Sequence, residues 1–447
     1  MNRIMLWALM LWSINAPARQ YIHNSTSLYL QTDKHIYTPS ERVWFTGYML
    51  NLDTSVDYHT MYVSLLDPIA HKPVLLEKFI LSSGVCYGML DLPDSLRSGD
   101  YPLIAFTNNY LLDSIEQEFH QWVSVRRPGE RPFIPSHVEG FKSPATQQKI
   151  DECKPIVSLS ADSSEYHQRS QTKWAVQIKD QDGKAVRGTF TVSCVLSNRL
   201  RENSNWNIRR FYYIDQHTFA NQQQINTGPH DVYPVSGYVL RGKKESGKAI
   251  PMLLMTSSNA VPFQTSKKGT FKLKADQVIA PWNTDAYLSI AKGNNSMNFR
   301  IVVWDDQQRI VNKLALVDYP YSQEMVVDSL VFTAKELENI GTLLHQGDTS
   351  RPPANLPVSA STEQEYLKKI KPAYLPVAFP VADYSTDTIA GLNIGTTLYW
   401  NYQLTTDEQG KAEFSFYTGD LPGDYTCFIQ GLTTLDYFVS KTEFHIK

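Results

Sequence analysis

The residues best placed to do chemistry in this sequence are two histidines that have aspartates beside them. His217 follows Asp215 by two positions and His230 directly precedes Asp231, both within an irregular stretch rich in Asn and Gln. A histidine next to a carboxylate can transfer a proton or bind a metal ion. A solvated loop explains the same residues without special chemistry. We favour the loop and predict neither a catalytic nor a metal site here.

The second candidate is a calcium-binding loop that would begin at Asp180. Asp182 and Gly183 follow and are residue types that such a loop uses, but the remaining ligands of a full loop are missing from the sequence. An Asp-Gly pair between two alternating segments is also a strong signal for a tight hairpin turn. We therefore predict a turn. Asp305 and Asp306 are interpreted in the same way, as a turn that follows a strand.

The sequence lacks the short motifs of several large enzyme classes. It has no GxSxG nucleophile elbow, no HExxH zinc helix, no P-loop and no GxGxxG dinucleotide fingerprint. We therefore predict that the protein is not an enzyme and that it has no cofactor and no bound metal.

Four aromatic residues form the strongest candidate for an interaction surface: Trp206, Phe211, Tyr212 and Tyr213. They lie in the irregular stretch and not on an alternating strand. Exposed rings that gather in one place are typical of surfaces that bind glycans or proteins. The alternative is that these rings cover the open end of a sandwich. We favour the covering role and keep the interaction surface as a hypothesis.

The chain has four cysteines, Cys86, Cys153, Cys194 and Cys427, and no two of them have CxxC spacing. A zinc site is therefore not expected. A disulfide can form if the chain folds in an oxidising compartment. Against a disulfide, all of them except Cys153 lie in apolar, strand-like contexts, where a free thiol behaves as a small hydrophobic side chain. The pairing stays open.

The N-terminus predicts export. Arg3 precedes an apolar run from Ile4 to Ile14, and the small residues 16–18 follow it. This is the pattern of a secretory signal peptide over residues 1–18, cleaved after Ala18. The run is too short for a membrane span, which needs about 20 apolar residues. Later apolar runs are shorter than that as well, so we expect no transmembrane segment in the mature chain.

Composition favours a β protein without a nucleic-acid partner. The formal net charge is −3 and the basic residues are scattered, so no electrostatic surface for nucleic acid is expected. Tyr and Trp are abundant, with 25 and 9 residues, and aromatic rings pack well on pleated strands. Short alternating segments recur along the chain with turn residues between them, as in β-sandwiches.

The alternating segments fall into blocks. The first block, residues 19–127, contains seven such segments, the number that a β-sandwich requires. A Pro- and Gly-rich linker at 128–149 separates it from a second block at 150–230, which has only three clear strands.

The third block spans residues 231–310, and the last block, residues 390–447, carries four strands. The residues between them, 311–389, are expected to be an irregular and partly helical connection. Apolar residues at helical spacing predict a short helix near 334–345, and a second helix is expected over 363–370.

The opening of the first block resembles a macroglobulin-type sandwich domain of the kind found in α2-macroglobulin and in many exported bacterial proteins. The matching residues are Thr32, Asp33, Lys34, Tyr37, Pro39, Glu41, Val43 and Phe45. Ser40 stands where the family has Gly. Period-two alternation predicts that Val43 and Phe45 face the core, while Trp44 points outward or toward a neighbouring domain. Glu41 is expected to accept hydrogen bonds from turn amides.

Weaker resemblances follow along the chain. Tyr166 and Arg169 repeat the corner of the first block, which implies a second macroglobulin-like domain. The third block is similar to the carboxypeptidase-regulatory-like fold, with matches at Gly237, Gly247, Gly269 and Phe271. The last block resembles a C-terminal module that accompanies these domains in Gram-negative bacteria rich in TonB-dependent receptors. Its matching residues are Thr397, Leu398, Tyr399, Trp400, Thr406, Asp407, Gly410, Phe416, Tyr417 and Asp420.

The strand counts predict an inserted domain. Three strands in residues 150–200 leave a sandwich half-built, with one apolar face uncovered. The four strands of residues 390–447 have no other companion, and three plus four make the seven that the fold needs. We therefore predict that these segments fold together around the third block, which would bring Cys194 and Cys427 into one domain.

These features predict an all-β fold: a string of macroglobulin-like, immunoglobulin-like β-sandwiches with one carboxypeptidase-regulatory-like β-sandwich and a minor helix near 334–345. The resemblance implies an exported, non-enzymatic protein of the periplasm or outer membrane that acts as a structural or protein-interaction scaffold. Its partners would be other envelope proteins, among them a TonB-dependent outer-membrane receptor. The alternative is a carbohydrate- or peptide-binding accessory protein for nutrient uptake at the outer membrane.

Overall fold

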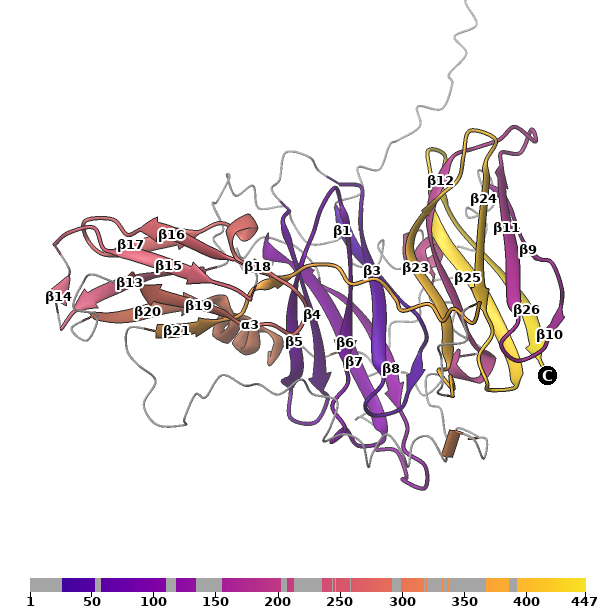
Figure 1. Cartoon of the computed structure of the whole chain (residues 1–447), viewed down its shortest axis with the longest axis horizontal. Coiled ribbons are helices and arrows are strands. Elements are labelled where there is room, and N and C mark those ends of the chain that lie inside the picture. Colours follow the sequence, from indigo (N-terminus) through magenta and orange to yellow (C-terminus); the bar gives the residue numbers. More distant parts are fainter. Residues whose placement is uncertain are drawn as a thin grey trace, which may run out of the picture.

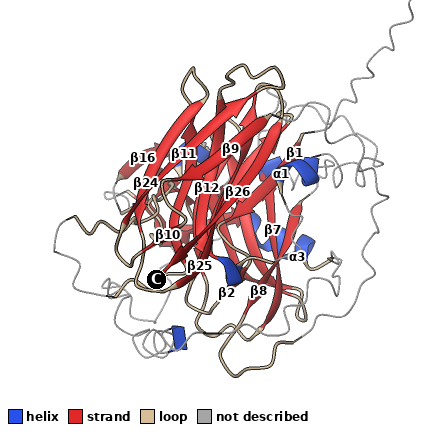
Figure 2. Cartoon of the chain, turned by 90° about the vertical axis from the view of Figure 1, so that its right-hand side faces the viewer, coloured by secondary structure: helices blue, strands red, loops and turns tan. Residues whose placement is uncertain are grey.

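A computed structural model gives the structure of the chain. It describes residues 26–52, 58–109, 118–133, 155–201, 207–212, 235–242, 244–245, 247–257, 259–291, 299–316, 319, 332, 336–337, 367–385 and 392–447. Strands dominate these residues and the helices are short, which confirms the predicted all-β class (Figure 2). No helix in the described part of the chain is long and apolar enough to cross a membrane. The predicted signal peptide lies outside the described residues.

The first sandwich packs two sheets against each other. The smaller sheet has the strand order β1, β3, β6, with bounds Ser27–Thr32, Arg42–Leu50 and Val85–Asp91. The larger sheet contains β5, β4, β7, β8 and β2, with bounds Lys72–Ile80, Thr60–Asp67, Gly99–Thr107, Phe119–Val125 and Ile36–Tyr37. Apolar residues at alternate positions fill the space between the sheets, among them Leu30, Val63 and Leu103.

The side chains of β3 point as the alternation predicted. Val43 and Phe45 are fully buried in the core of the first sandwich, where Phe45 meets Phe79 edge to face at 4.9 Å between ring centroids. Trp44 lies on the opposite face and packs against Trp400, which belongs to the second sandwich. The expectation that Trp44 points toward a neighbouring domain is therefore confirmed.

The second sandwich is assembled from two segments that lie far apart in the chain. The first segment supplies β9, β10, β11 and β12, with bounds Ile156–Ala161, Glu165–Tyr166, Gln171–Lys179 and Gly188–Leu196. The second supplies β23, β24, β25 and β26, with bounds Thr397–Thr405, Lys411–Tyr417, Gly423–Thr433 and Tyr437–Ile446. β11 pairs with β24, and β12 lies between β23 and β25. The predicted pairing of residues 150–200 with residues 390–447 is therefore present (Figure 1).

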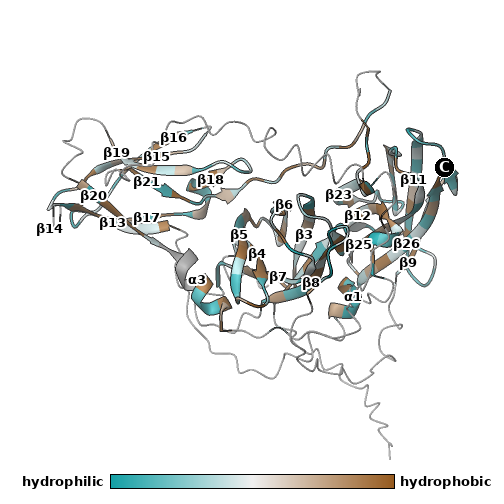
Figure 3. Ribbon diagram, turned by 90° about the horizontal axis from the view of Figure 1, so that it is seen from below, coloured by the Kyte–Doolittle hydropathy of each residue, from teal (hydrophilic) through white to brown (hydrophobic). Residues whose placement is uncertain are grey.

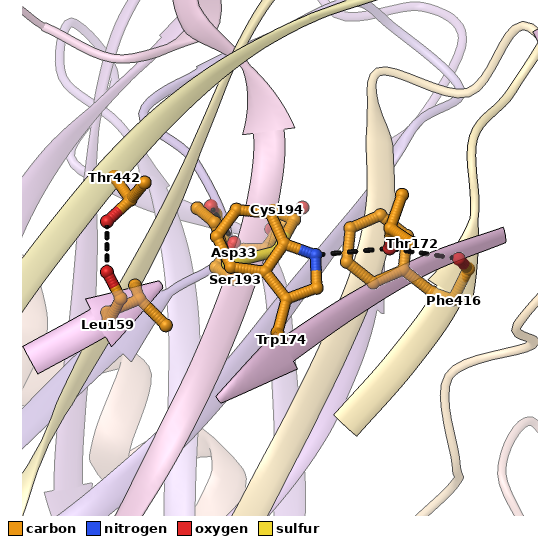
Figure 4. Close-up of a disulfide and its surroundings, with 9 residues drawn as sticks. Asp33, Leu159, Thr172, Trp174, Ser193, Cys194, Phe416 and Thr442 are labelled. Carbon is orange, nitrogen blue, oxygen red and sulfur yellow. Dashed lines mark hydrogen bonds between the residues drawn. A yellow bond between two sulfur atoms is a disulfide. The ribbon is translucent and has the colours of Figure 1, made fainter. Parts of the chain in front are cut away.

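A disulfide joins the two segments of the second sandwich. Cys194 of β12 and Cys427 of β25 are cross-strand partners, and both are fully buried. Figure 4 shows this disulfide beside Trp174, whose ring also stacks on Phe416. The indole N–H of Trp174 donates to Thr172 Oγ1 at 3.1 Å, so the polar atom of this buried ring is satisfied.

The third sandwich is inserted between these two segments. In one of its sheets β13 pairs with β14, β17 and β20, with bounds Val235–Arg241, Lys244–Glu245, Thr270–Leu273 and Phe299–Asp305. The other sheet has the order β16, β15, β19, β21, with bounds Ala260–Gln264, Pro251–Met255, Ala286–Ile290 and Leu367–Ile370. Its core includes Val239, Met252, Phe271, Leu288 and Ile301.

The helix predicted over residues 363–370 is wrong in its described part. Leu367–Ile370 forms β21, which pairs with β19, and Ile370 is buried in the core of the third sandwich. Pairing with a sheet edge and burial of Ile370 outweigh the local helix propensity of so short a segment. Of the helix expected near 334–345, the structure describes residues 336–337 alone, and both are helical.

A short helix occupies the position where a turn was expected at Asp305 and Asp306. Helix α3 spans Asp306–Leu314 and begins directly after β20. Ile310 and Leu314 are fully buried against the larger sheet of the first sandwich. This contact, made with residues far away in sequence, is the reason that a helix forms where the local pattern predicted a turn.

Two short strands also attach the third sandwich to the first. β18 (Ile279–Ala280) and β22 (Ala373–Tyr374) extend the larger sheet of the first sandwich beyond β5. A second short helix, α1 (Ile208–Arg210), packs at the boundary between the first and second sandwiches. The three sandwiches lie in a row with the first in the middle, as the views in Figure 1 and Figure 3 agree.

Candidate functional site

The sheet of β1, β3 and β6 buries both of its faces. One face lines the core of the first sandwich. On the other, cross-strand pairing places Tyr29 opposite Tyr48 and Gln31 opposite Thr46, and Trp44 follows on the same side of β3. All five residues are buried, although strands at an open surface alternate buried with exposed positions. A second body therefore covers this face.

The covering body is the second sandwich, whose sheet of β12, β23 and β25 packs face to face on the sheet of β1, β3 and β6. The hydroxyl of Tyr29 donates to Gln430 Oε1 at 2.9 Å. The hydroxyl of Ser193 donates to the carbonyl of Asp33 at 2.7 Å (Figure 4). We call the surface between these two sheets the sandwich junction.

Aromatic rings fill the sandwich junction. Trp44 and Met89 of the first sandwich cluster with Trp400 of the second. Tyr87 stacks on Tyr402 with an angle of 8° between the ring planes. Aromatic pairs of this kind contribute about 0.5–1.5 kcal/mol beyond the burial of their area. The junction is therefore packed like a core and not like a loose contact between modules.

A buried carboxylate closes one end of the sandwich junction. Asp33 is fully buried and accepts hydrogen bonds from the Tyr37 hydroxyl at 2.8 Å, the Trp44 amide at 3.1 Å and the Thr397 hydroxyl at 2.6 Å. Burial raises the pKa of Asp33 because the charged form loses its water, while Lys34 and these hydrogen bonds oppose the rise. Thr397 comes from the second sandwich, so both sandwiches are needed to satisfy this carboxylate.

The neighbouring ion pair also spans the junction. Lys34 Nζ lies 2.9 Å from Glu41 Oε1 and donates to Thr396 Oγ1 at 2.6 Å, and Thr396 in turn donates to Glu41. Burial by itself raises the pKa of Glu41, but the Lys34 ammonium and the Arg199 guanidinium outweigh burial and lower it to about 2. Glu41 also accepts from the Thr38 amide at 2.6 Å, which confirms its expected role in the turn.

The turn that holds Glu41 contains the departure from the resembled family pattern. Ser40 has a φ of +67°, in the left-handed region that glycine adopts without a steric penalty. A residue with a side chain costs about 1 kcal/mol more in this conformation. The turn therefore keeps the geometry of the family's glycine although a serine occupies it.

A second ion pair brings a distant segment to the same place. Arg199, at the end of the short turn Ser197–Arg199, pairs with Glu336, and their side chains are only 1% and 3% exposed. The ring centroid of Phe332 lies 5.3 Å from the guanidinium carbon of Arg199. The His35 amide donates to the carbonyl of Arg199 at 3.1 Å. Three parts of the chain therefore meet at this end of the sandwich junction.

Two of the four residues in the predicted interaction surface lie at the rim of the sandwich junction. Phe211 and Tyr212 are half-buried there, with the ring of Phe211 at 5.4 Å from that of Tyr29. Trp206 and Tyr213 lie outside the described residues. Whether these four residues form an interaction surface stays a prediction.

The other sequence candidates can be placed in part. Asp180 Oδ1 accepts hydrogen bonds from the amides of Asp182 at 3.0 Å and Lys184 at 2.8 Å, which confirms a tight turn here. The turn is not that of a hairpin, because the strands that it joins, β11 and β12, lie in different sheets. His217 and His230 lie outside the described residues. In the part of the chain that the structure describes, no three His, Cys, Asp or Glu residues are grouped so that they could hold a metal ion.

Sequence reasoning missed the residues with which the second sandwich completes the junction. They are polar side chains of ordinary type, Thr191, Thr396, Thr397 and Gln430. Thr397 is one of the matches to the resembled C-terminal module, but nothing in the local pattern of the four residues indicates a role in the junction. A signal for the junction was nevertheless present in β3, because Trp44 and Tyr48 stand at positions that face away from the core. Large aromatic residues on the outer face of a strand indicate that another body covers it.

Comparisons with known proteins give similarity of fold at low identity. No family model and no curated protein matches the chain. The structure of Escherichia coli alpha-2-macroglobulin activated by porcine elastase is 10% identical over 94% of this chain and 44% of that chain, with a TM-score of 0.30. Salmonella alpha-2-macroglobulin reacted with methylamine is 8% identical over 94% of this chain and 39% of that chain, also at 0.30.

A further neighbour is the Escherichia coli adhesin FdeC. It is 12% identical over 40% of this chain and 50% of that chain, with a TM-score of 0.17. The chain spans less than half the length of the alpha-2-macroglobulins that it matches. At these scores the likeness carries no argument about function, which has to come from the sandwich junction and the surfaces of this chain.

Proposed function

We propose that this chain is an exported, non-enzymatic scaffold of the cell envelope that holds protein-contact surfaces in a fixed arrangement. The observation that supports it most is the shared polar network of the sandwich junction. Asp33 needs Thr397, and the pair of Lys34 and Glu41 needs Thr396, so each buried charge is satisfied by a group from the other sandwich. Separating the sandwiches would remove the hydrogen bonds of Thr397 and Thr396 to these charges, at a cost of about 1.5–3 kcal/mol for each hydrogen bond to a charged group.

The attachment of the third sandwich supports the same role. β22 continues the larger sheet of the first sandwich, where Tyr374 pairs with Phe79, and Leu314 of α3 packs against that sheet. Lys371, which precedes β22, lies 2.7 Å from Glu77 of β5. The link between these sandwiches is therefore part of a sheet and not a free linker, which favours a stiff body over a string of mobile modules.

We further propose that the protein works in the periplasm or at the outer membrane, next to a TonB-dependent receptor. The disulfide between Cys194 and Cys427 supports an oxidising compartment, where such bonds persist. The receptor as partner rests on the resemblance of residues 390–447 to modules that accompany these receptors, and the third sandwich is proposed to be carboxypeptidase-regulatory-like on the residues that match that fold.

The stiffness can be tested by spin labels on the first and second sandwiches. Lys72→Cys in β5 and Glu413→Cys in β24 are both exposed positions, while Cys86 is buried. Both are introduced together with Cys153→Ser, so that Cys153 takes no label. A scaffold gives one narrow distance distribution between the labels. Adding Trp44→Glu, which places a charge in the sandwich junction, should broaden it. The same change at an exposed strand position, Lys173→Glu, should not.

A broad distribution in the otherwise unaltered chain would contradict the scaffold. The partner is tested separately by chemical cross-linking in the native envelope and purification of the full chain. Recovery of a TonB-dependent receptor in stoichiometric amount is the expected result, and recovery of the chain without any envelope protein would overturn this part of the proposal.

A further inference from the structure

The third sandwich keeps one face of a sheet open to solvent. The outward positions of three neighbouring strands share this face: Ser236, Tyr238 and Leu240 in β13, Arg300, Val302 and Trp304 in β20, and Thr270 and Lys272 in β17. Trp304 is 57% exposed, whereas every other tryptophan that the structure describes is buried or half-buried. We call this surface the outer β13 face.

The centre of the outer β13 face is aromatic. The rings of Tyr238 and Trp304 lie 5.3 Å apart between centroids, with an angle of 59° between their planes. Tyr238 is half-exposed, and neither ring belongs to the core of the third sandwich. Burying one exposed ring on folding would stabilise the sandwich by about 2 kcal/mol, a gain that these positions forgo. The contact between the two rings contributes to the sheet, but more than half of the Trp304 side chain stays exposed and is available to a ligand.

Charge and hydroxyl groups surround this aromatic centre. Arg300 and Lys272 are exposed on either side of it, in β20 and β17. None of the outward residues of these three strands is acidic, while Glu245 of the short strand β14 pairs with Leu240 at the end of β13 and so stands on the same side of the sheet. Ser236 and Thr270 add hydroxyls beside the rings. The outer β13 face therefore combines stacking surface, positive charge and neutral hydrogen-bonding groups.

The dimensions of the face favour a narrow ligand. Three strands spaced about 4.8 Å apart, with outward residues about 6.8 Å apart along each strand, give a patch on the order of 10 by 14 Å. A stable protein partner covers about 800 Å² on each side, several times this area. A chain of two or three sugar rings matches it.

We propose that the outer β13 face binds an anionic polysaccharide. Trp304 and Tyr238 stack on the apolar face of a sugar ring, because the faces of aromatic rings take up such C–H groups. Arg300 pairs with a carboxylate or sulfate of a neighbouring sugar, and Lys272 adds positive charge on the other side of the rings. This binding site is independent of the sandwich junction, so the chain would carry a glycan site on the sandwich at the opposite end from the second one (Figure 1).

Affinity electrophoresis of the full chain tests the site with defined probes. The gels contain polygalacturonate, alginate, dextran sulfate or the neutral polymer dextran. Retardation by at least one of the anionic polymers, and none by dextran, is the expected result. Comparing the two carboxylate polymers with the sulfated polymer distinguishes recognition of carboxylates from recognition of sulfates. Trp304→Ala should weaken the retention about tenfold, as expected for loss of one stacking contact and its orientation of the ligand.

Matched variants separate a built site from general ion exchange. Arg300→Ala should weaken binding like Trp304→Ala, while Lys268→Ala, an exposed lysine in a turn of the same sandwich, should leave it unchanged. Equal losses for Arg300→Ala and Lys268→Ala, or unchanged binding in Trp304→Ala, would overturn the proposal. So would retention by dextran equal to that by the anionic polymers, absence of retention by all of them, or loss of an envelope protein partner as the sole effect of Trp304→Ala.

Discussion

The first and second sandwiches begin with the same corner, built from an aspartate and a tyrosine four residues later. In the first, the Tyr37 hydroxyl donates to Asp33 at 2.8 Å, and in the second the Tyr166 hydroxyl donates to Asp162 at 2.6 Å. Both tyrosines are buried. Asp33 is fully buried beneath the second sandwich, whereas Asp162 is exposed.

The strand that follows each corner shows what the difference means. The Trp44 amide donates to Asp33 and the Lys173 amide donates to Asp162, so these two residues occupy equivalent positions on outward-facing sides. Trp44 is 5% exposed in the sandwich junction, while Lys173 is in solvent. The local motif of aspartate and tyrosine determines the geometry of the corner. Whether the aspartate and the side chain on the following strand are buried depends on the neighbouring sandwich. The following experiments test that division.

The largest effect is expected from removing the disulfide with Cys194→Ala and Cys427→Ala together. The bond closes a loop with a sequence separation of 233 residues. Loop-closure entropy predicts a loss of up to about 5 kcal/mol in the free energy of unfolding of the second sandwich. Urea unfolding of this sandwich should therefore have a much lower midpoint. Trp44, which the second sandwich covers, should become exposed to solvent in the same transition. The wild-type chain reduced with dithiothreitol is the matched control, and an unchanged midpoint in both would show that strand pairing alone holds the two segments together.

The second prediction compares the two equivalent strand positions directly. Trp44→Ala should lower the free energy of unfolding by about 3–5 kcal/mol, because it leaves a cavity in a packed junction. Lys173→Ala should change it by less than about 0.5 kcal/mol, as is usual for exposed positions. Both are measured by urea unfolding. Similar values for the two variants would mean that the junction is not packed as described.

The sequence allowed the inward and outward faces of these strands to be predicted, because they follow from period-two alternation. Val43, Phe45 and Trp44 take their expected sides for that reason. The assembly of the second sandwich could also be predicted, since an incomplete set of strands needs a companion to cover its apolar face. These are properties of patterns that the chain carries locally or in its strand counts.

The polar partners at the junction could not be predicted, because their positions depend on how two finished sandwiches meet. Thr397 satisfies Asp33 from a position more than 360 residues later. Glu336 pairs with Arg199 from a segment whose apolar spacing predicts a helix but says nothing about its partner. The helix expected over residues 363–370 is wrong because of a similar distant partner. Leu367–Ile370 pairs with β19 at the edge of a sheet and is therefore a strand. Tertiary partners decide the structure wherever the local preference is weak.

The stability of the first sandwich, whose corner lies beneath the second, should also depend on pH through His35. The amide of Arg201 donates to its Nδ1 at 3.3 Å, and burial together with the Arg201 charge lowers the pKa of His35 to about 3. Because this is below the ordinary value of 6.5, the unfolded chain binds the proton first, and stability falls as the pH drops from 6.5 toward 3. The expected loss is about 2 kcal/mol at pH 5.

His35→Gln should remove that part of the pH dependence between pH 7 and pH 5, measured by urea unfolding at both values. His71→Asn, at an exposed position, is the control and should follow the wild type. If His35→Gln and His71→Asn have the same pH dependence, His35 is open to water and that end of the junction is looser than the structure indicates.

The smallest expected effect is a difference in sign between Asp33 and Asp162. Burial raises the pKa of Asp33, so protonation of the folded chain sets in above the ordinary value of 3.8 and adds stability as the pH falls toward it. For Asp162 the slight burial is outweighed by the hydrogen bonds from Tyr166 and the Lys173 amide, which lower the pKa. The stability that Asp162 contributes is therefore present above pH 3.8 and is lost as the pH falls through its folded pKa.

Asp33→Asn and Asp162→Asn remove these two titrations. Between pH 6 and pH 3 the stability difference from wild type should therefore widen for Asp33→Asn and shrink for Asp162→Asn. Parallel changes in the two variants would mean that the second sandwich does not shield the corner of the first from water, and that both corners titrate as surface groups.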